Sequence, residues 1–412
     1  MPGVESTAEA DWREVPGGVT APLGYRAAGI AAGLKPSGAP DLALIVSEEE
    51  AIAAGVFTTS QVRAACVDYC RDLLQNQPTA RAMLCNAGQA NAATGEFGRQ
   101  DNLAMARQVG AALGIPSNQV LTASTGVIGR RIPLDKFTAA VPTLVNHLSD
   151  DGSEVAARAI ITTDLVTKSV ALESTLGDRP VRIGGIAKGS GMIHPNMATM
   201  LAFITCDAAV SPHLWQQMVQ RAADRSFNQI TVDGDTSTND MLLALANGQS
   251  RTPAITEPGG PAGRLEAMLT EVCVRLAKAI ARDGEGATCL IEVEVTGAAE
   301  EAEARQIART IAGSMLVKSA VFGRDPNWGR IAAAAGRAGV FFPADQLRIQ
   351  LGEFLLMEGG EPLTFDRAAA SAYLRQDPVI IRVGLGMGTA AGRAWGCDLS
   401  YDYVKINAEY TT

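Results

Sequence analysis

The sequence is poor in the residues that bind metals or form disulfides. It contains 3 histidines and 7 cysteines in 412 residues, and no two cysteines have the C-x-x-C spacing. A zinc cluster therefore has few ligands from which to be built, and we expect no metal. We interpret the cysteines as small buried hydrophobic residues of a protein in a reducing compartment, the cytoplasm. They are Cys66, Cys70, Cys85, Cys206, Cys273, Cys289 and Cys397.

The sequence also lacks an excess of positive charge and a targeting segment. The net charge is −9 and the isoelectric point is near 5.1, so neither nucleic acid nor an anionic membrane is an expected partner. Residues 1–14 are acidic and mixed, with no basic flank before an apolar stretch, and predict no secretory signal. The long uncharged run 189–206 contains Pro195, Asn196 and His194, so we do not interpret it as a membrane span.

Bulk composition indicates an ordinary globular protein. Hydrophobic residues make up 47% of the sequence and charged residues 19%, which is typical of a soluble protein with a sizeable core. The length corresponds to two or three domains or to one large composite domain. No internal repeat or low-complexity linker is visible, and the Pro/Gly cluster 257–261 is interpreted as a surface loop.

Strand-like runs alternate with helical patterns along the whole chain. Strands are predicted at 41–46, 54–58, 81–86, 120–123, 169–173, 181–186, 199–205, 229–232, 290–295, 347–356, 379–383 and 403–406. Helices are predicted at 62–74, 101–113, 153–161, 212–225 (with Ser211 as N-cap), 263–282, 300–311, 328–337 and 367–375. Because several neighbouring strands are expected to pair as hairpins, we favour a layered α+β fold over a doubly wound parallel sheet.

The uncharged run and the residues before it decide the functional interpretation. Residues 184–202 are Gly-Gly-Ile-Ala-Lys-Gly-Ser-Gly-Met-Ile-His-Pro-Asn-Met-Ala-Thr-Met-Leu-Ala. A phosphate loop needs Gly-Lys-[Ser/Thr], whereas the order here is Ala-Lys-Gly. A serine-hydrolase elbow needs Gly-x-Ser-x-Gly, but Lys188 and Met192 hold the outer positions around Ser190.

A third interpretation is a self-cleaving junction at Thr199. A threonine hydroxyl is a weak nucleophile and needs a base beside it. If Thr199 were the first residue of a chain, its own α-amine, with a pKa of roughly 8, would serve as that base. The glycines upstream would allow the backbone to bend tightly at the scissile peptide. The residues alone nevertheless favour a glycine-rich turn that leads into an ordinary core strand.

A family resemblance reverses that preference. The segment Lys188–Leu201 closely resembles the cleavage region of the ornithine acetyltransferase family of arginine biosynthesis, whose members are also called glutamate N-acetyltransferases. Seven further segments resemble signatures of this family, in the family's order and over nearly the whole chain. They are Asn-Ala-Gly-Gln-Ala-Asn-Ala (86–92), Leu-Thr-Ala-Ser-Thr-Gly-Val-Ile-Gly (121–129), Ala-Ile-Ile-Thr-Thr-Asp (159–164), Ser-Thr-Asn-Asp (237–240), Asp-Gly-Glu-Gly-Ala-Thr (283–288), Asp-Pro-Asn-Trp-Gly-Arg (325–330) and Asn-Ala-Glu-Tyr-Thr-Thr (407–412).

The resemblance implies self-cleavage followed by acetyl transfer. By similarity, Thr199 attacks the carbonyl of Ala198, and residues 1–198 and 199–412 stay together as α and β chains of one composite unit. The Thr199 hydroxyl then takes the acetyl group of N-acetylornithine and passes it to glutamate, which predicts ping-pong kinetics. No metal, nucleotide or prosthetic group is implied, and acetyl-CoA would be a substrate only. The implied fold is a layered αββα sandwich of the N-terminal-nucleophile type, and the implied assembly is α2β2 or larger.

The resemblance also assigns site residues. Thr125 and Gly126 match the oxyanion hole, where a hydroxyl and a backbone N–H suit a developing negative charge. Lys188 matches a lysine that binds a substrate carboxylate, and Glu285 matches a residue that holds an amine or assists proton transfer. The other substrate contacts implied are Thr199, Thr162 (preferred to Thr163), Asn407 and Thr412. Without the resemblance, the same residues would be interpreted as a strand-end turn, an exposed lysine, a solvated loop acid and a frayed chain end.

Two other functional classes stay open. A self-cleaving aminopeptidase or amidase of the same superfamily would resolve its acyl-enzyme with water, but its nucleophile is typically serine, which favours the transferase. A non-catalytic binding protein would keep the Ala198–Thr199 bond intact. The sequence does not decide whether acetyl-CoA is a second acetyl donor. It assigns no role to residues 325–330, and it places His194 in a turn or packing role.

Overall fold

The computed structural model describes residues 12–194 and 200–409. Its larger sheet, called the large sheet below, has nine strands in the order β1-β6-β7-β8-β10-β3-β4-β5, with β2 paired to β3. The strands are β1 (Trp12–Glu14), β2 (Tyr25–Ile30), β3 (Leu42–Phe57), β4 (Thr79–Gln89), β5 (Val120–Val127), β6 (Lys168–Leu176), β7 (Arg179–Lys188), β8 (Leu201–Cys206) and β10 (Met241–Ala246).

Strand β3 divides the large sheet into two halves that face each other. Its first residues pair with β2 and β4 and its last residues pair with β10, with a register shift between Val46 and Ala51. The two halves share an inner apolar cluster, to which one half contributes Ile45 and Met83 and the other contributes Phe203. Side chains alternate between the faces of a strand, so every second residue of these strands points outward. Strand β3 bends between its two ends and so turns one sheet into two stacked layers.

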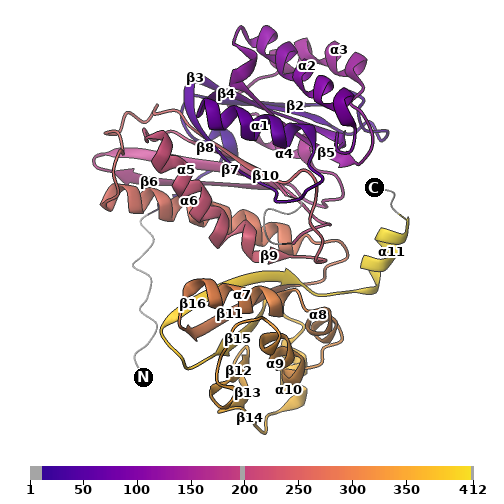
Figure 1. Cartoon of the computed structure of the whole chain (residues 1–412), viewed down its shortest axis with the longest axis vertical. Helices are drawn as coiled ribbons and strands as arrows, with labels where there is room; N and C mark the ends of the chain where they lie inside the picture. The colour runs from indigo at the N-terminus through magenta and orange to yellow at the C-terminus, as the bar shows by residue number, and fades with distance from the viewer. Residues whose placement is uncertain (1–11, 195–199, 410–412) are drawn as a thin grey trace.

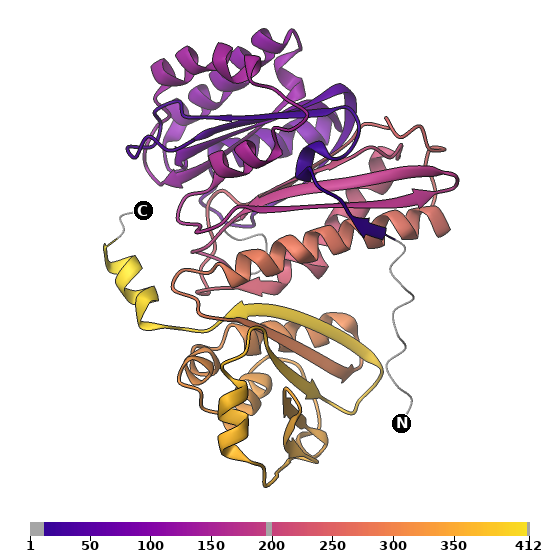
Figure 2. The same cartoon turned by 180° about the vertical axis from the view of Figure 1, so that it is seen from behind.

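Helices cover both outer faces of this double layer (Figures 1 and 2). Helices α2 (Gly95–Leu113) and α3 (Leu134–Asn146) pack on β3 and β4, where Leu44 and Leu84 contact the cluster around Phe137. Helices α5 (Pro212–Arg225) and α6 (Gly260–Arg282) cover β7, β8 and β10. Helices α1 (Ala65–Asn76) and α4 (Ser153–Ile160) contribute buried side chains to the inner cluster. The layered α+β fold predicted from the sequence is confirmed.

A second sheet of seven strands forms the lower part of the molecule in Figure 1. Its order is β14-β13-β12-β15-β11-β16-β9. The strands are β9 (Ile230–Thr231), β11 (Leu290–Ala298), β12 (Arg348–Leu351), β13 (Phe354–Glu358), β14 (Glu361–Pro362), β15 (Val379–Gly384) and β16 (Ala390–Cys397). It is accompanied by helices α7 (Glu301–Ala312), α8 (Met315–Phe322), α9 (Trp328–Gly336) and α10 (Arg367–Tyr373), and it has an apolar core of its own.

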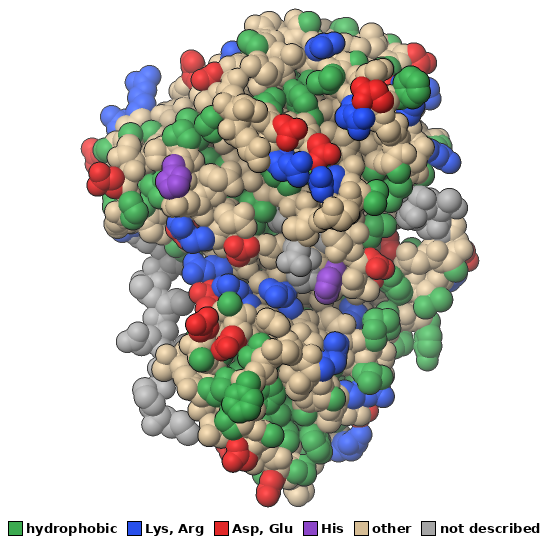
Figure 3. All heavy atoms as spheres, in the orientation of Figure 1, with side chains coloured by type: hydrophobic (Ala, Val, Ile, Leu, Met, Phe, Trp, Pro, Cys, Tyr) green, Lys and Arg blue, Asp and Glu red, His purple; other side chains and the backbone are tan. Residues whose placement is uncertain are grey.

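Ion pairs join the second sheet and its helices to the helices of the large sheet. Arg225 of α5 pairs with Glu301 of α7 at 3.1 Å, and Lys278 of α6 pairs with Glu292 of β11 at 2.8 Å. On the face drawn in Figure 3, basic and acidic side chains likewise lie next to one another. Partly exposed pairs of this kind fix orientation more than they add stability.

Strands from both sides of the Ala198–Thr199 bond pair directly in the large sheet. Lys188 at the end of β7 pairs with Leu201 at the start of β8, and β8 runs parallel to β10. The first half of the chain also supplies β3, which pairs with β10. Division into chains 1–198 and 199–412 stays a prediction, because residues 195–199 lie outside the described residues.

Several predicted elements are corrected by the structure. The strand predicted at 403–406 is wrong, because these residues lie within helix α11 (Tyr401–Glu409). Its apolar residues suggested a strand, but within residues 12–194 and 200–409 no strand pairs with it. The strand predicted at 347–356 is a hairpin of β12 and β13, turned at Gly352 with a φ of +58°. The strands predicted at 41–46 and 54–58 are parts of the single strand β3, and β2, β10, β16, α3 and α8 had not been predicted.

The cysteines lie where their interpretation as buried hydrophobic residues places them. All seven are buried and carry free thiols, and burial raises the pKa of the Cys66 thiol to about 11. Within residues 12–194 and 200–409, three or more metal-ligating side chains are nowhere grouped as a metal site would require. In the same part of the chain, no helix combines the length and apolar character of a membrane span.

Candidate active site

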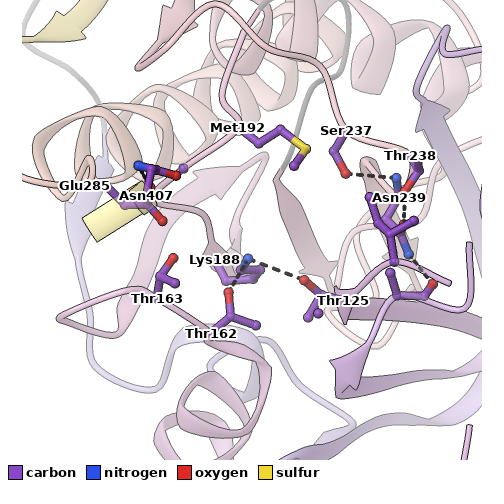
Figure 4. Close-up of a pocket in the computed structure, with 14 residues that line it drawn as sticks. Thr125, Thr162, Thr163, Lys188, Met192, Ser237, Thr238, Asn239, Glu285 and Asn407 are labelled. Atoms are coloured by element: carbon purple, nitrogen blue, oxygen red, sulfur yellow. Dashed lines mark hydrogen bonds between the residues drawn. The ribbon is translucent and has the colours of Figure 1, made fainter. Parts of the chain in front are cut away.

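A pocket lies where several strand ends of the large sheet meet (Figure 4). The ends of β5 and β7 and the loop before β10 contribute to it, together with the segment after α4, the loop after α6 and helix α11. The space between its lining residues, with the open mouth included, is about 640 Å³. The lining residues are Ala90, Thr125, Gly126, Ile128, Thr162, Thr163, Lys188, Gly191, Met192, Ser237, Thr238, Asn239, Glu285 and Asn407.

Lys188 is the buried cation of this pocket. Only 4% of its surface is exposed, which makes the alternative interpretation as an ordinary surface lysine wrong. Its Nζ donates to Thr162 Oγ1 at 2.9 Å and to Thr125 Oγ1 at 3.4 Å, as Figure 4 shows. The nearest carboxylate oxygen, Oδ2 of Asp164, is 3.9 Å away. A buried ammonium needs partners of this kind to stay charged.

Behind Lys188 lies a second, fully buried lysine with two carboxylates. Lys168 Nζ donates to Asp164 Oδ1 at 2.7 Å and to Asp283 Oδ2 at 2.6 Å. Asp164 also accepts from the backbone N–H groups of Gly189 (2.6 Å) and Thr162 (3.1 Å). Burial alone would raise the pKa of the Asp164 carboxyl, but the charges of Lys188 and Lys168 and these hydrogen bonds lower it to about 2. Asp164 is therefore an anion at any physiological pH.

The end of β5 is held in a fixed conformation beside Lys188. Gly126 has a φ of +129°, and a Cβ there would lie 2.3 Å from the carbonyl carbon of Gly88, so only glycine fits. Asn239 Nδ2 donates to the carbonyl of Ala90 at 2.6 Å and to that of Ser124 at 2.7 Å. These bonds fix the backbone at the ends of the neighbouring strands β4 and β5. The Thr125 hydroxyl and the Gly126 N–H consequently belong to a rigid strand end, as preorganised donors require.

The opposite wall brings together Glu285, Gly191 and Asn407. Glu285 N donates to the carbonyl of Ser190 at 2.9 Å, and Asn407 Nδ2 donates to Glu285 Oε2 at 2.9 Å. A Cβ on Gly191 would lie 2.4 Å from the Glu285 carboxyl carbon, so the carboxylate can lie this close to the chain only because Gly191 has no side chain. Helix α11 thus reaches the pocket through Asn407.

The backbone turn after Gly191 is held by hydrogen bonds to Asp233. The carboxylate of Asp233 accepts from Met192 N at 2.6 Å and Ile193 N at 2.9 Å, with Met192 at a φ of +59°. His194 Nδ1 lies 3.1 Å from Thr231 Oγ1 and is not among the lining residues. Burial, followed by the charge of Arg309, lowers its pKa. His194 therefore has the packing role that the sequence indicated.

The structure places six predicted site residues in one pocket. They come from five separate segments and are Thr125, Gly126, Thr162, Lys188, Glu285 and Asn407. Thr163, the alternative to Thr162, lines the pocket as well, but the hydroxyls that accept from Lys188 are those of Thr162 and Thr125. Ala198, Thr199 and Thr412 lie outside the described residues.

Other residues of the site were not predicted. Ser237, Thr238 and Asn239 belong to a quoted family signature that had been given no role. Asp164 ends one family signature and Asp283 begins another, but neither had been given a role, and Lys168, which donates to both carboxylates, lies in none of the signatures. Ser190, which the serine-elbow interpretation would need exposed, is buried and donates to the carbonyl of Asp283 at 2.7 Å.

The signature 325–330 is structural. Asn327 caps α9 by accepting from Arg330 N at 3.1 Å. Asp325 pairs with Arg367 at the start of α10 at 2.6 Å. Neither residue lines the pocket, so this segment joins two helices of the second sheet.

Comparison with known proteins identifies the family. The sequence profile of the ArgJ family matches residues 26–412. The chain belongs to the ArgJ family. The arginine biosynthesis bifunctional protein ArgJ 1 of Nostoc sp. is 72% identical, covering 98% of this chain and 100% of that protein. The ArgJ bifunctional protein of a Synechococcus strain is 68% identical, with 98% and 100% covered.

A solved member of the ArgJ family is also similar to this chain. The crystal structure of the ArgJ bifunctional protein of Bacillus halodurans is 46% identical, covers 50% of this chain and 98% of its own, and has a TM-score of 0.49.

Proposed function

We propose that the chain transfers the acetyl group of N-acetylornithine to glutamate through an acetyl ester on Thr199. Membership of the ArgJ family makes it an acetyltransferase of arginine biosynthesis. The composition of the pocket supports acetyl transfer from N-acetylornithine to glutamate. Two potential oxyanion donors, a buried cation and a carboxylate, supplied by separate segments, surround one pocket.

The nucleophile is formed by cleavage of the Ala198–Thr199 bond. Thr199 is bonded to Met200, which is buried and whose carbonyl accepts from Met241 N at 3.2 Å at the start of β10. The loop before β10 supplies Ser237, Thr238 and Asn239 to the pocket. In the cleaved protein, the α-amine of Thr199 takes the proton of its own hydroxyl.

The acetyl group moves in two balanced steps. Thr199 Oγ attacks the acetyl carbonyl of N-acetylornithine, and the C–N bond breaks when the α-amine of ornithine leaves with the proton held by the Thr199 amine. The amine of glutamate then attacks the ester, giving N-acetylglutamate and the free hydroxyl. In both steps the Thr125 hydroxyl and the Gly126 N–H donate to the oxyanion. Thr125 Oγ1 accepts from Lys188, which leaves its own O–H free to donate.

Charged residues select amino-acid substrates. Lys188 binds the α-carboxylate that N-acetylornithine and glutamate share. Glu285 faces the opposite end of the pocket, where its carboxylate, held by Asn407, suits the side-chain ammonium of ornithine. Thr162 orients Lys188, and Thr412 completes the substrate contacts.

We further propose acetyl-CoA as a second acetyl donor. Relatives that are 68% and 72% identical over nearly the whole chain are named bifunctional. Thr199 would take the acetyl group of the thioester and pass it to glutamate, with no metal or prosthetic group involved. The protein would work in the cytoplasm as an α2β2 or larger assembly.

Two measurements test the proposal. N-acetylornithine is supplied with and without glutamate. Formation of N-acetylglutamate supports the transferase, whereas release of acetate alone favours the aminopeptidase or amidase alternative. Denaturing mass spectrometry should show two chains that meet at Thr199, and one 412-residue chain in Thr199→Ala. An intact wild-type chain would contradict self-cleavage and favour a binding protein.

A further inference from the structure

Lys188 of the pocket and three buried charges behind it form a balanced group, called the charge cluster below. It consists of Lys168, Asp164, Asp283 and Lys188. The side chains of Lys168 and Asp164 are completely buried, and those of Asp283 and Lys188 are 6% and 5% exposed. Two cations and two anions cancel, which is the condition under which charges tolerate such burial.

The contacts within the charge cluster are unequal. Asp164 lies 2.7 Å from Lys168 but 3.9 Å from Lys188. Lys168 is thus the direct partner of Asp164, and the Lys188 ammonium is held by two neutral hydroxyls, of Thr162 and Thr125. A lysine bound by hydroxyls keeps its charge for an incoming anion, whereas one in a direct ion pair has that charge already neutralised.

Lys168 also ties together three segments that line the pocket. Through Asp164 it holds the N–H groups of Thr162 and Gly189, on either side of Lys188. Through Asp283 it holds the loop that carries Glu285, because the Asp283 side chain accepts from Leu165 N at 3.1 Å. Lys168 itself does not line the pocket.

We propose that Lys168 is a positioning residue that occupies Asp164 and so leaves the Lys188 ammonium to the substrate carboxylate. Without the charge of Lys168, Asp164 would draw Lys188 into a direct ion pair, and substrate would have to break that pair to bind. This inference rests on the proposed role of Lys188.

The first test compares Lys168→Met with the wild type, using cleaved protein of both. We expect the KM for N-acetylornithine to rise about tenfold or more, as for loss of a charged hydrogen bond, while kcat changes by less than about threefold. Lys168→Gln, which can still donate to a carboxylate but has no charge, should raise KM as well and serves if Lys168→Met does not fold. A folded variant with the wild-type KM would overturn the proposal.

Two double variants separate positioning from mere stability. Both K168M/D164N and K168M/D283N restore the charge balance of the cluster, but only the first removes the carboxylate that captures Lys188. We expect K168M/D164N to lower KM at least about threefold relative to K168M, and K168M/D283N to leave it raised. Equal recovery in both, or recovery in neither, would mean that Lys168 acts only through folding.

A structural measurement is independent of the substrate. In a crystal structure of K168M without ligand, Lys188 Nζ should lie about 3 Å from an Asp164 oxygen instead of the 3.9 Å seen here. If the wild type does not transfer acetyl groups, the proposed function fails, yet this distance still decides the inference. An unchanged distance would overturn it.

Discussion

The ammonium of Lys188 lies 3.4 Å from the hydroxyl oxygen of Thr125, although the two residues belong to strands far apart in the large sheet. Strand β7 carries Lys188 and β5 carries Thr125, with β8, β10, β3 and β4 between them. The bend at β3 places the two strand ends across the same pocket. A positive charge beside the hydroxyl favours its donation to an oxyanion, so the fold couples substrate binding to transition-state stabilisation.

This relationship makes Thr125→Val a direct test of the oxyanion role. Valine keeps the shape of the side chain but removes the donor, so kcat should fall about 10²- to 10³-fold, as for loss of one oxyanion donor. KM for N-acetylornithine should change much less. Steady-state kinetics of cleaved protein measure both, and Thr125→Ser, which keeps the hydroxyl, is the control. A valine variant with the kcat of the serine variant would contradict the assignment.

Gly126 should be intolerant of any side chain. Alanine would place a methyl group 2.3 Å from the carbonyl carbon of Gly88 at a φ of +129°, so the strand end must move. We expect Gly126→Ala to lower both kcat and the melting temperature. Gly129→Ala is the matched control, because Gly129 also has a positive φ (+79°) but open space around it. Its cost should be limited to about 1 kcal/mol of backbone strain. Equal melting temperatures would show that close packing at Gly126 is unimportant.

Local patterns in the sequence predicted much of this fold. Helices with clear apolar periodicity, such as α5 and α6, were predicted with their C-terminal ends at the observed residues. Strand β10 was missed because Met-Leu-Leu-Ala-Leu-Ala is made of helix formers and is buried on both faces, which removes the alternation that indicates a strand. Helix α11 was mistaken for a strand, because Tyr-Val-Lys-Ile (403–406) consists largely of strand formers. Its contact with the pocket joins Asn407 to Glu285, 122 residues apart.

The site was predictable only where family signatures exist. No periodicity links Thr125 to Lys188 or Glu285, and their meeting depends on the bend of the large sheet and on the loop after α6. The contacts of the charge cluster could not be predicted, although Asp164, Lys188 and Asp283 lie within family signatures. Lys168 and Asp283 are 115 residues apart, and each one by itself resembles a solvated surface residue.

The ambiguity between Thr162 and Thr163 can be settled with a pair of variants. Thr162 Oγ1 accepts from Lys188 at 2.9 Å, whereas Thr163 lines the pocket but is not one of the two hydroxyls that hold this lysine. Thr162→Val should therefore raise KM for N-acetylornithine about tenfold, since one of the two hydroxyls that hold the ammonium is lost. Thr163→Val should raise it less than about threefold. The reverse order in the same kinetic assay would assign the substrate contact to Thr163.

Stability in acid should depend on Asp164 with a definite sign. Although burial opposes its ionisation, Lys188 and Lys168 lower its pKa to about 2 from a usual value of 3.8. The folded protein therefore binds this proton less readily than the unfolded chain. The resulting stabilisation is fully present above about pH 4 and is lost as the pH falls towards 2, and it amounts to roughly 2 kcal/mol. Asp207 provides the opposite case, because burial raises its pKa despite hydrogen bonds from Arg182 and Leu23.

Urea unfolding at pH 5 and at pH 2.5 measures this difference. Asp164→Asn should be less stable than the wild type at pH 5, because Lys168 loses one anionic partner, but its midpoint should fall less on acidification. Asp207→Asn should show a larger fall than the wild type, because it lacks a carboxyl that favours the folded state when protonated. If both variants lost stability in acid in parallel with the wild type, Asp164 would not be ionised by its lysine partners, and the balance of charges behind the pocket would have to be reassigned.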